Sequence, residues 1–370
     1  MRSVCMYGIL YLTMAQHLSN WLYDPKYSYH DNLKFGPFGD LNKQPKYKNA
    51  GEPKYDFFGT NVYSPFGIAA GPLPAAKFVG SALDRGFDIV TFKTVRSDTY
   101  PCLPGPNVFP LDLKKLDPLK TDDLIKTKNS FDFPMTLANS FGIPSFKPTV
   151  WQPEIKKSFK LLDQGQALLV AFQGTLSPGS RQKFINDHVK GVGLLVETGA
   201  KVVEINLSCP NEGHSNLLCF DIETSKTIVE KVHKAYPDLQ LIVKVTYFND
   251  DEHLRLFVKE IGPLLAGITA INTVGANIVD KKGKQAFSGS ESRRKAGVSG
   301  LAIKHLAIDM VKRLKKHRGE LNLNFKIIGV GGVQTAQDFH DHRNAGADFV
   351  MGLTGVMWNP NLAAEIKASL

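Results

Sequence analysis

The chain has 370 residues, enough for one large α/β barrel or two smaller domains, and its 43% hydrophobic and 22% charged residues are ordinary for a globular protein. No apolar run approaches the length of a transmembrane helix, so we expect no stable membrane span. The net charge of +10 is spread along the chain. It is compatible with phosphates, nucleic acid or anionic metabolites and singles out none of them, and we expect no nucleic-acid partner.

The four cysteines, Cys5, Cys102, Cys209 and Cys219, show no CxxC spacing. This argues against a disulfide framework, a structural zinc site or an iron–sulfur centre carried by this chain, and no metal site is predicted. A reducing, cytoplasmic setting is the simpler interpretation.

The first 57 residues show no sustained periodicity. Residues 1–15 resemble a signal peptide only loosely, because Cys5 and Tyr7 interrupt the apolar run, no clean cleavage site follows and Met14 is an alternative start. The stretch from residue 21 onward is rich in Tyr, Lys, Pro, Gly and Asn. We therefore predict that residues 1–57 are an irregular N-terminal extension wrapped on the surface of the domain that follows.

From residue 58 to residue 370, short apolar or β-branched runs alternate with amphipathic helical stretches. A β-α unit repeated about eight times is the signature of a parallel barrel, so residues 58–370 are predicted to form one (β/α)8 TIM barrel, an α/β fold. There is one strand candidate too many, and we place Met135–Asn139 outside the barrel wall. The candidates are Phe66–Ala70, Asp88–Lys93, Met135–Asn139, Leu168–Phe172, Val202–Asn206, Leu241–Val245, Ile268–Asn272, Lys326–Val330 and Asp348–Leu353.

Two segments interrupt this rhythm. Residues 100–134 form a Pro-rich insertion, and residues 274–298 form a long basic loop. Loops that follow barrel strands line the active-site face, so both segments are either parts of a pocket or its lid, or solvated surface insertions.

Polar residues stand at the carboxyl ends of several strand candidates, where a buried strand has no structural need for them. Amides that converge on one face can bind a planar ring with both NH and C=O groups, because each amide supplies a donor and an acceptor. The lysines add positive charge where an anion is held, for example a reduced flavin. These residues are Lys93, Asn139, Asn206, Lys244 and Asn272.

The run VEINLSCPN, residues 203–211, presents Cys209 on a turn. The strand candidate ends in Asn206 and Pro210 stiffens the turn, so the thiol is expected on an exposed loop. With Asn206 and Asn211 beside it, a reactive thiol is favoured over a small buried hydrophobe.

Glycine-rich turns follow the last strand candidates at residues 297–300, 331–332 and 354–355. Backbone N–H groups at such turns suit a phosphate, and barrels commonly place a phosphate site there. A dinucleotide fingerprint GxGxxG after a first strand is not seen. The phosphate is therefore expected to be that of FMN.

Two specific motifs, NLSCPN at residues 206–211 and NSFGIPS at residues 139–145, resemble those of the dihydroorotate dehydrogenases. The resemblance covers residues 58–370, and FKT, VKV, INT and GVGG occur in the family's order. It implies FMN-dependent oxidation of dihydroorotate to orotate in pyrimidine biosynthesis, in which Cys209 takes a proton from C5 while a hydride leaves C6 for FMN. The cysteine indicates the soluble class, because the membrane-associated class carries serine.

The resemblance also implies the roles of the other site residues, with Cys209 as the catalytic base and the backbone of residues 141–143 at the substrate carboxylate. The substrate would be bound by Lys93, Asn139, Phe141, Gly142, Ile143, Asn206, Asn211, Asn272 and Thr273. FMN would be bound by Ala70, Gly71, Lys93, Thr94, Asn139, Asn206, Lys244, Ser299, Gly300, Gly331, Gly332, Thr354 and Gly355.

The chain departs from the family pattern in ways that leave the electron acceptor open. The soluble class is usually shorter, and Leu353 and Ser299 stand where glycine is often found. Fumarate, a quinone, or a partner flavoprotein with its own iron–sulfur centre would each fit. The family leads us to expect a homodimer.

Three other functions are compatible with parts of the sequence. A dihydropyrimidine dehydrogenase-like subunit would act on uracil or thymine, but that family usually has histidine where Asn211 stands, and NSFGIP suits a carboxylate. A dihydrouridine synthase would act on RNA, but no helical RNA-binding domain follows the barrel. A non-catalytic FMN-binding module would have no need of Cys209 together with the polar strand ends.

Overall fold

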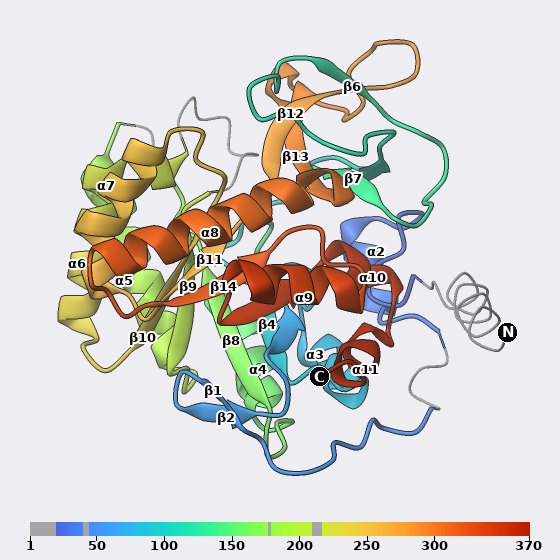
Figure 1. Cartoon of the computed structure of the whole chain (residues 1–370). Helices are drawn as coiled ribbons and strands as arrows, with labels where there is room; N and C mark the ends of the chain where they lie inside the picture. Colours follow the sequence, from blue (N-terminus) through green and yellow to red (C-terminus); the bar gives the residue numbers. More distant parts are fainter. Residues whose placement is uncertain (1–19, 40–43, 177–178, 209–216) are drawn as a thin grey trace, which may run out of the picture.

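The computed structural model describes residues 20–39, 44–176, 179–208 and 217–370. Its centre is a closed barrel of eight parallel strands, in which the last strand pairs back onto the first (Figure 1). The predicted TIM barrel is confirmed, and β7 (Thr136–Asn139) lies outside the wall as predicted. The barrel strands are β3 (Phe66–Ile68), β4 (Ile89–Val95), β8 (Ala167–Phe172), β9 (Val202–Asn206), β10 (Gln240–Val245), β11 (Gly267–Ala270), β14 (Lys326–Val330) and β15 (Phe349–Gly352).

Helices connect the strands and cover the outside of the barrel. They are α3 (Ala76–Asp84), α4 (Pro148–Phe159), α5 (Arg181–Val196), α6 (Ile222–Ala235), α7 (Asp251–Ile261), α8 (Lys304–Glu320), α9 (Ala336–Ala345), α10 (Thr354–Trp358) and α11 (Leu362–Lys367). Local sequence sets their ends: α9 begins with a capping box between Thr335 and Asp338 and stops at Gly346, whose φ is +114°. No helix in the described ranges is long and apolar enough to cross a membrane. On α5, one stripe of the helix is buried, formed by Phe184, His188, Val192 and Leu195.

The barrel interior changes from apolar to polar along its axis. Near the bottom, residues such as Ile242 and Val202 are buried, and the hairpin of β1 (Tyr55–Phe57) and β2 (Thr60–Val62) closes the end with Phe57 (Figure 1). Two positions further along their strands stand Lys244 and Glu204, which are also buried. Because side chains alternate across a strand, these two face the same interior.

A second sheet stands above the carboxyl ends of the barrel strands (Figure 1). This upper sheet has five strands in the order β5-β7-β13-β12-β6. Residues 100–134 and 274–298, which we expected to be loops, contribute four of them: β5 (Val108–Pro110), β6 (Leu124–Lys126), β12 (Val274–Val279) and β13 (Lys295–Gly300). The loop prediction was wrong because β5 and β6 are only three residues long, while glycine and polar residues interrupt the six-residue strands β12 and β13. In addition, β12 pairs with β6 and β13 pairs with β7, both of which lie far away along the chain.

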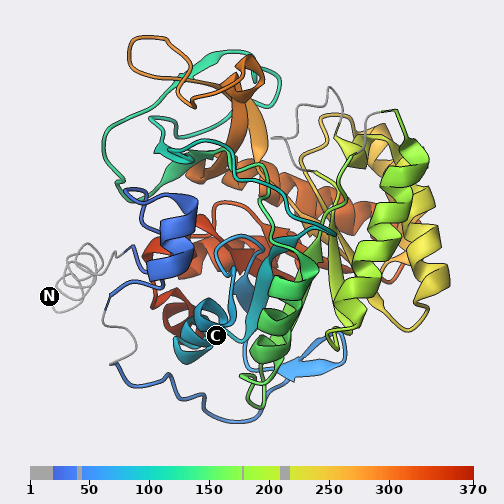
Figure 2. The same cartoon turned by 180° about the vertical axis from the view of Figure 1, so that it is seen from behind.

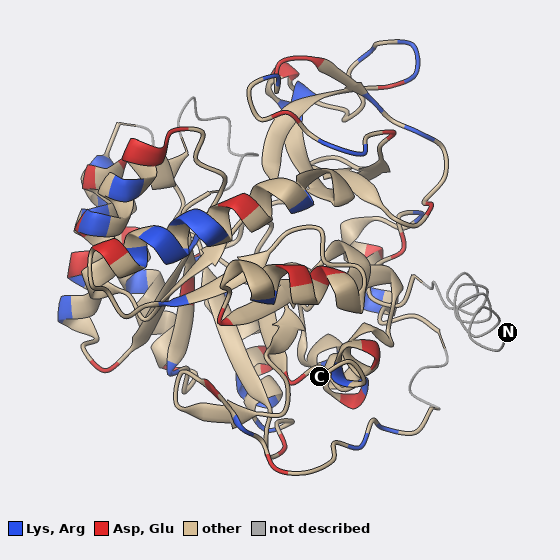
Figure 3. Cartoon of the chain, viewed as in Figure 1, with Lys and Arg blue, Asp and Glu red and all other residues tan. Residues whose placement is uncertain are grey.

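The described part of the N-terminal extension packs against the barrel domain more closely than we expected. It contains α2 (Tyr29–Phe35), which lies next to the upper sheet (Figure 2). Trp21 and Leu22 are buried, and Trp21 Nε1 donates to Val356 O at 2.6 Å. These buried anchors were not predicted, because single aromatic residues give no periodic signal. Charged residues lie mainly on the outer helices and on loops, including those of the upper sheet (Figure 3).

Candidate active site

A cavity with about 1520 Å³ of empty space, including its open mouth, lies between the strand ends of the barrel, the upper sheet and the N-terminal segment. All five polar strand-end residues predicted from the sequence line it. They are Lys93, Asn139, Asn206, Lys244 and Asn272. The convergence expected from the sequence is therefore present, with one amide contributed by the upper sheet and not by the barrel.

The other predicted site residues fall into three groups. Those that also line the cavity are Ala70, Gly71, Thr94, Phe141, Gly142, Ile143, Thr273, Ser299, Gly300, Gly331, Gly332 and Thr354. Gly355 does not line it, and a Cβ at Gly355 would meet Val333 O at 2.5 Å. Cys209 and Asn211 lie outside the described residues.

Lys244 is paired with Glu204 from the neighbouring strand. Lys244 Nζ lies 2.8 Å from Glu204 Oε1, and the two side chains are 6% and 1% exposed. The contact is an ion pair without good hydrogen-bond direction, and Glu204 Oε2 has no hydrogen-bond partner within the described ranges. A buried carboxylate of this kind is tolerated because the cation of Lys244 is beside it. Removal of either charge would therefore leave the other buried and unpaired.

Asn206 and Asn272 hold each other in one network. Asn206 Nδ2 donates to Gln173 Oε1 at 2.8 Å, while its Oδ1 accepts from Asn272 Nδ2 at 3.1 Å. Asn272 Nδ2 also donates to Ser208 O at 3.1 Å, and Ser208 Oγ donates to Lys244 O at 3.1 Å. Both amides are therefore fixed in orientation, and so is Ser208, the residue that precedes Cys209.

The turn formed by residues 141–143 presents backbone donors to the cavity. Gly142 and Ile143 have φ values of +77° and +51°, and their N–H groups donate to no acceptor in the described part of the chain. Lys93 stands beside this turn, since its Nζ donates to Pro144 O at 2.5 Å. Unpaired N–H groups next to a cation can bind a carboxylate.

The glycine turns at the last strands line the cavity and pack closely against the protein behind them. A Cβ on Gly300 would lie 2.2 Å from Met135 O, and one on Gly332 would lie 2.4 Å from Lys304 Cβ, so larger residues do not fit. The N–H groups of Gly331 and Gly332 donate to no acceptor among the described residues. Thr354 Oγ1, in contact with Ser299 Oγ at 3.2 Å, adds a hydroxyl. This donor set fits the phosphate of FMN.

The N-terminal segment supplies a part of the wall that we did not predict from the sequence. Leu22, Tyr23, Tyr29, Asn32 and Leu33 line the cavity, and burial raises the pKa of both tyrosines well above its usual range. Tyr29 also lies against Lys93, whose Nζ is 5.7 Å from the ring centre. The one signal in the sequence was the high aromatic content of this segment, which does not indicate where it docks.

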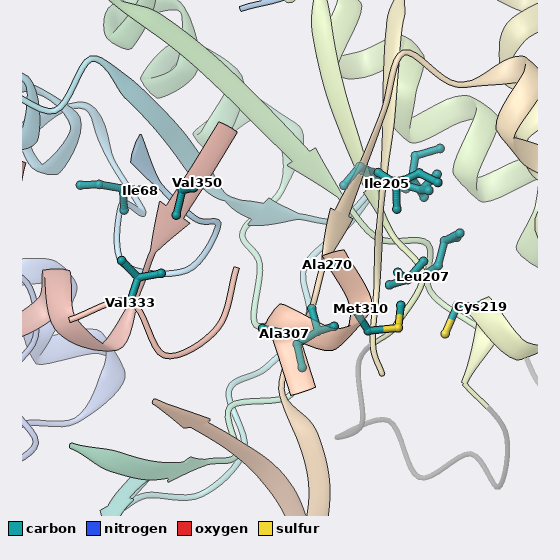
Figure 4. Packing of buried hydrophobic residues seen from close by; sticks show 14 of the residues in the cluster. Ile68, Ile205, Leu207, Cys219, Ala270, Ala307, Met310, Val333 and Val350 are labelled. Atoms are coloured by element: carbon teal, nitrogen blue, oxygen red, sulfur yellow. The ribbon is translucent and has the colours of Figure 1, made fainter. Parts of the chain in front are cut away.

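Two other cysteines are poor candidates for a base. Cys219 is fully buried among residues such as Leu207 and Met310 (Figure 4), and burial raises the pKa of its thiol to about 12. Cys102 is half-buried, and burial raises the pKa of its thiol to about 11. Thiolate, the form that takes up a proton, is scarce at both positions near neutral pH.

Comparison with known proteins identifies the family. A sequence model described as "Dihydroorotate dehydrogenase" matches residues 130–370. A dihydroorotate dehydrogenase of Dictyostelium discoideum is 35% identical over an alignment of 361 residues that covers 93% of this chain and 96% of that protein. This chain belongs to the dihydroorotate dehydrogenase family. The family predicted from the NLSCPN and NSFGIPS motifs is thus confirmed.

Other members of the dihydroorotate dehydrogenase family match less of the chain. The catalytic subunit of dihydroorotate dehydrogenase B (NAD(+)) from Staphylococcus carnosus is 33% identical over 168 residues, 45% of this chain and 51% of that protein. The crystal structure of a ligand-free dihydroorotate dehydrogenase from Eimeria tenella superposes with a TM-score of 0.68, at 20% identity, over 88% of this chain and 89% of that one. The likeness to the Eimeria tenella structure supports the assignment of the fold.

Proposed function

We propose that this chain oxidises dihydroorotate to orotate, with FMN bound at the mouth of the barrel and Cys209 as the base. The observation that carries the substrate assignment is the turn at Gly142 and Ile143, whose unpaired N–H groups line the same cavity as the strand-end amides. Dihydroorotate has a carboxylate on a ring that bears both NH and C=O groups. The turn suits the carboxylate, and Asn206 and Asn272 suit the ring.

FMN is proposed as the flavin because the cavity offers what its parts require. The turn at Gly331 and Gly332 supplies N–H donors for the phosphate, and Lys244 supplies a positive charge for the electron-rich edge of the ring system. When bound, FMN would supply the acceptor for the hydride that leaves C6 of the substrate.

Cys209 is proposed as the base that takes the proton from C5. Ser208, directly before it, is held against β10, and its carbonyl accepts from Asn272, which lines the cavity. Cys102 and Cys219 have raised thiol pKa values, which makes them unsuited to the role. A cysteine with an ordinary pKa of about 8.5 is only partly ionised at neutral pH, so the rate should rise with pH.

We further propose residues 58–370 as the catalytic domain and residues 1–57 as an extension. The extension contributes to the cavity wall through its described residues between Leu22 and Leu33.

The test is anaerobic stopped-flow reduction of the purified flavoprotein by dihydroorotate and by dihydrouracil. Dihydroorotate should bleach the flavin absorbance far faster, because each charge-assisted hydrogen bond to the carboxylate contributes about 1.5–3 kcal/mol, and the loss of two costs on the order of a hundredfold. Comparable rates with both compounds would contradict the proposal and favour a pyrimidine-degrading enzyme. Reoxidation by fumarate, a quinone or NAD in the same apparatus identifies the electron acceptor.

A further inference from the structure

Arg96 lies directly after β4, and its side chain is fully buried, with a relative exposure of 0%. Its Nε donates to Ile143 O at 3.0 Å and its Nη2 donates to Gly142 O at 3.3 Å. Its Nη1 donates to Gly174 O at 3.1 Å, in the segment that follows β8. One guanidinium therefore holds two consecutive carbonyls of the turn and ties them to the barrel.

These contacts set the direction of the turn's N–H groups. In a trans peptide, the C=O and N–H of one unit point in opposite directions. The carbonyl of Phe141 accepts from Leu103 N at 3.0 Å and the carbonyl of Gly142 accepts from Arg96, so the N–H groups of Gly142 and Ile143 point away from both donors. Both residues line the cavity. Arg96 therefore acts from the side of the turn opposite to the ligand.

The conformation of the turn needs such support. Ile143 has a φ of +51°, a left-handed conformation that β-branched residues rarely adopt, and Gly142 has a φ of +77°. Strained backbone of this kind persists only where its surroundings hold it. Arg96 holds it through a planar fork of donors that the single ammonium of a lysine does not reproduce.

We propose that Arg96 is a positioning residue for the substrate carboxylate, because it fixes the turn whose N–H groups bind that carboxylate. The proposal rests on the proposed function of the cavity. A second contribution comes through the peptide unit between Gly142 and Ile143, since the hydrogen bond from Arg96 to the Gly142 carbonyl polarises the N–H of Ile143 and makes it a better donor.

The substitution Arg96→Lys keeps the positive charge and removes the fork. Arg85→Lys is the matched control, because Arg85 is also buried and its Nη2 donates to Pro45 O at 2.6 Å, away from the cavity. The measurement is the slope of the flavin reduction rate against substrate concentration, for dihydroorotate and for dihydrouracil, on holoenzyme with matched flavin content.

We expect Arg96→Lys to lower the slope for dihydroorotate by on the order of tenfold or more, and to change the slope for dihydrouracil by about twofold at most. Arg85→Lys should leave both slopes unchanged. The double variant Arg96→Lys/Ile143→Gly should recover part of the loss, because glycine adopts a positive φ without strain.

Two results would overturn the proposal: an unchanged slope for dihydroorotate in Arg96→Lys, or equal losses for both substrates. If the wild-type enzyme is not reduced by dihydroorotate at all, the failure lies with the proposed function and not with Arg96. If Arg96→Lys yields too little folded holoenzyme, Arg96→Gln carries the same comparison.

Discussion

Lys244 Nζ and Glu204 Oε1 lie 2.8 Å apart inside the barrel, on the neighbouring strands β10 and β9. Lys244 lines the cavity and Glu204 does not, so a cation at the cavity wall is backed by a buried carboxylate. Substitutions at the two positions should therefore separate the role of the pair in stability from the role of the lysine in flavin binding.

We predict that Lys244→Ala loses most of its bound flavin and is also destabilised. The flavin loses a cation at its electron-rich edge, and Glu204 is left as an unpaired buried charge, which costs about 3–5 kcal/mol of the free energy of unfolding. The measurements are the ratio of flavin to protein absorbance and urea denaturation of the apoprotein.

The double substitution Lys244→Met/Glu204→Gln serves as the control for this prediction. With both charges removed, most of the stability should return while flavin binding stays weak. Wild-type flavin content in either variant would argue that Lys244 does not contact the flavin.

We predict that Cys209→Ala abolishes turnover while flavin stays bound, and that Cys219→Ala keeps wild-type turnover. Cys209 is the proposed base, whereas Cys219 is a packing residue in the core, and its loss should cost about 1 kcal/mol of stability. Steady-state rates and flavin content measure both effects. If the Cys219 substitution is the one that stops turnover, the base has been assigned to the wrong cysteine.

We predict that Gly332→Ala weakens flavin binding. Its φ of +74° disfavours alanine, and the new Cβ would lie 2.4 Å from Lys304 Cβ, so the turn must move. Gly319→Ala in α8 is the matched control: nothing lies within 4 Å of its Cβ position, and alanine should stabilise the helix by up to about 1 kcal/mol. Titration of each apoprotein with FMN gives the dissociation constants to compare, and equal values would show that the turn is not part of the cofactor site.

We predict that the protein loses stability as the pH falls from 6.5 to about 4. Burial lowers the pKa of His188 from 6.5 to about 4, so in this window the unfolded chain binds the proton and the folded chain does not. The contribution of His188 is complete above pH 6.5 and is lost as the pH falls toward 4, about 3 kcal/mol in total. Urea denaturation at a series of pH values should show this decline. His188→Gln should make the decline shallower, and an unchanged decline would assign it to other groups.

The sequence predicted the barrel and most of the candidate site because both leave local signals. Each barrel strand is a short apolar run followed by a helical stretch, and a polar residue at the end of such a run is conspicuous. Lys93 and Asn206 could be placed at the mouth of the barrel on that basis alone, since parallel strands present their carboxyl ends on one face.

The parts that could not be predicted depend on contacts between distant segments. Two strands of the upper sheet, β5 and β6, are too short to show a period, and glycine interrupts β12 and β13. Nothing in residues 21–35 indicates that Leu22 and Tyr29 reach the cavity. Arg96 directly follows a strand, as several other charged residues do, so its position in the sequence does not distinguish it. Its function becomes visible only when the carbonyls of Gly142 and Ile143, 46 and 47 positions away, are seen to accept from it.

The pairing of β7 with β13 has a consequence for the order in which a growing chain can assemble. Asn139 and Gly297 are partners in that pairing and lie 158 positions apart, and the barrel itself closes only when β15 reaches β3. During synthesis, β7 and the turn of residues 141–143 that follows it therefore emerge from the ribosome long before β13, the strand that pairs with β7. During that interval the partly synthesised chain exposes the apolar surface of an incomplete barrel, which favours aggregation. The flavin can be bound only late, after the strands that form the barrel have been synthesised and have paired.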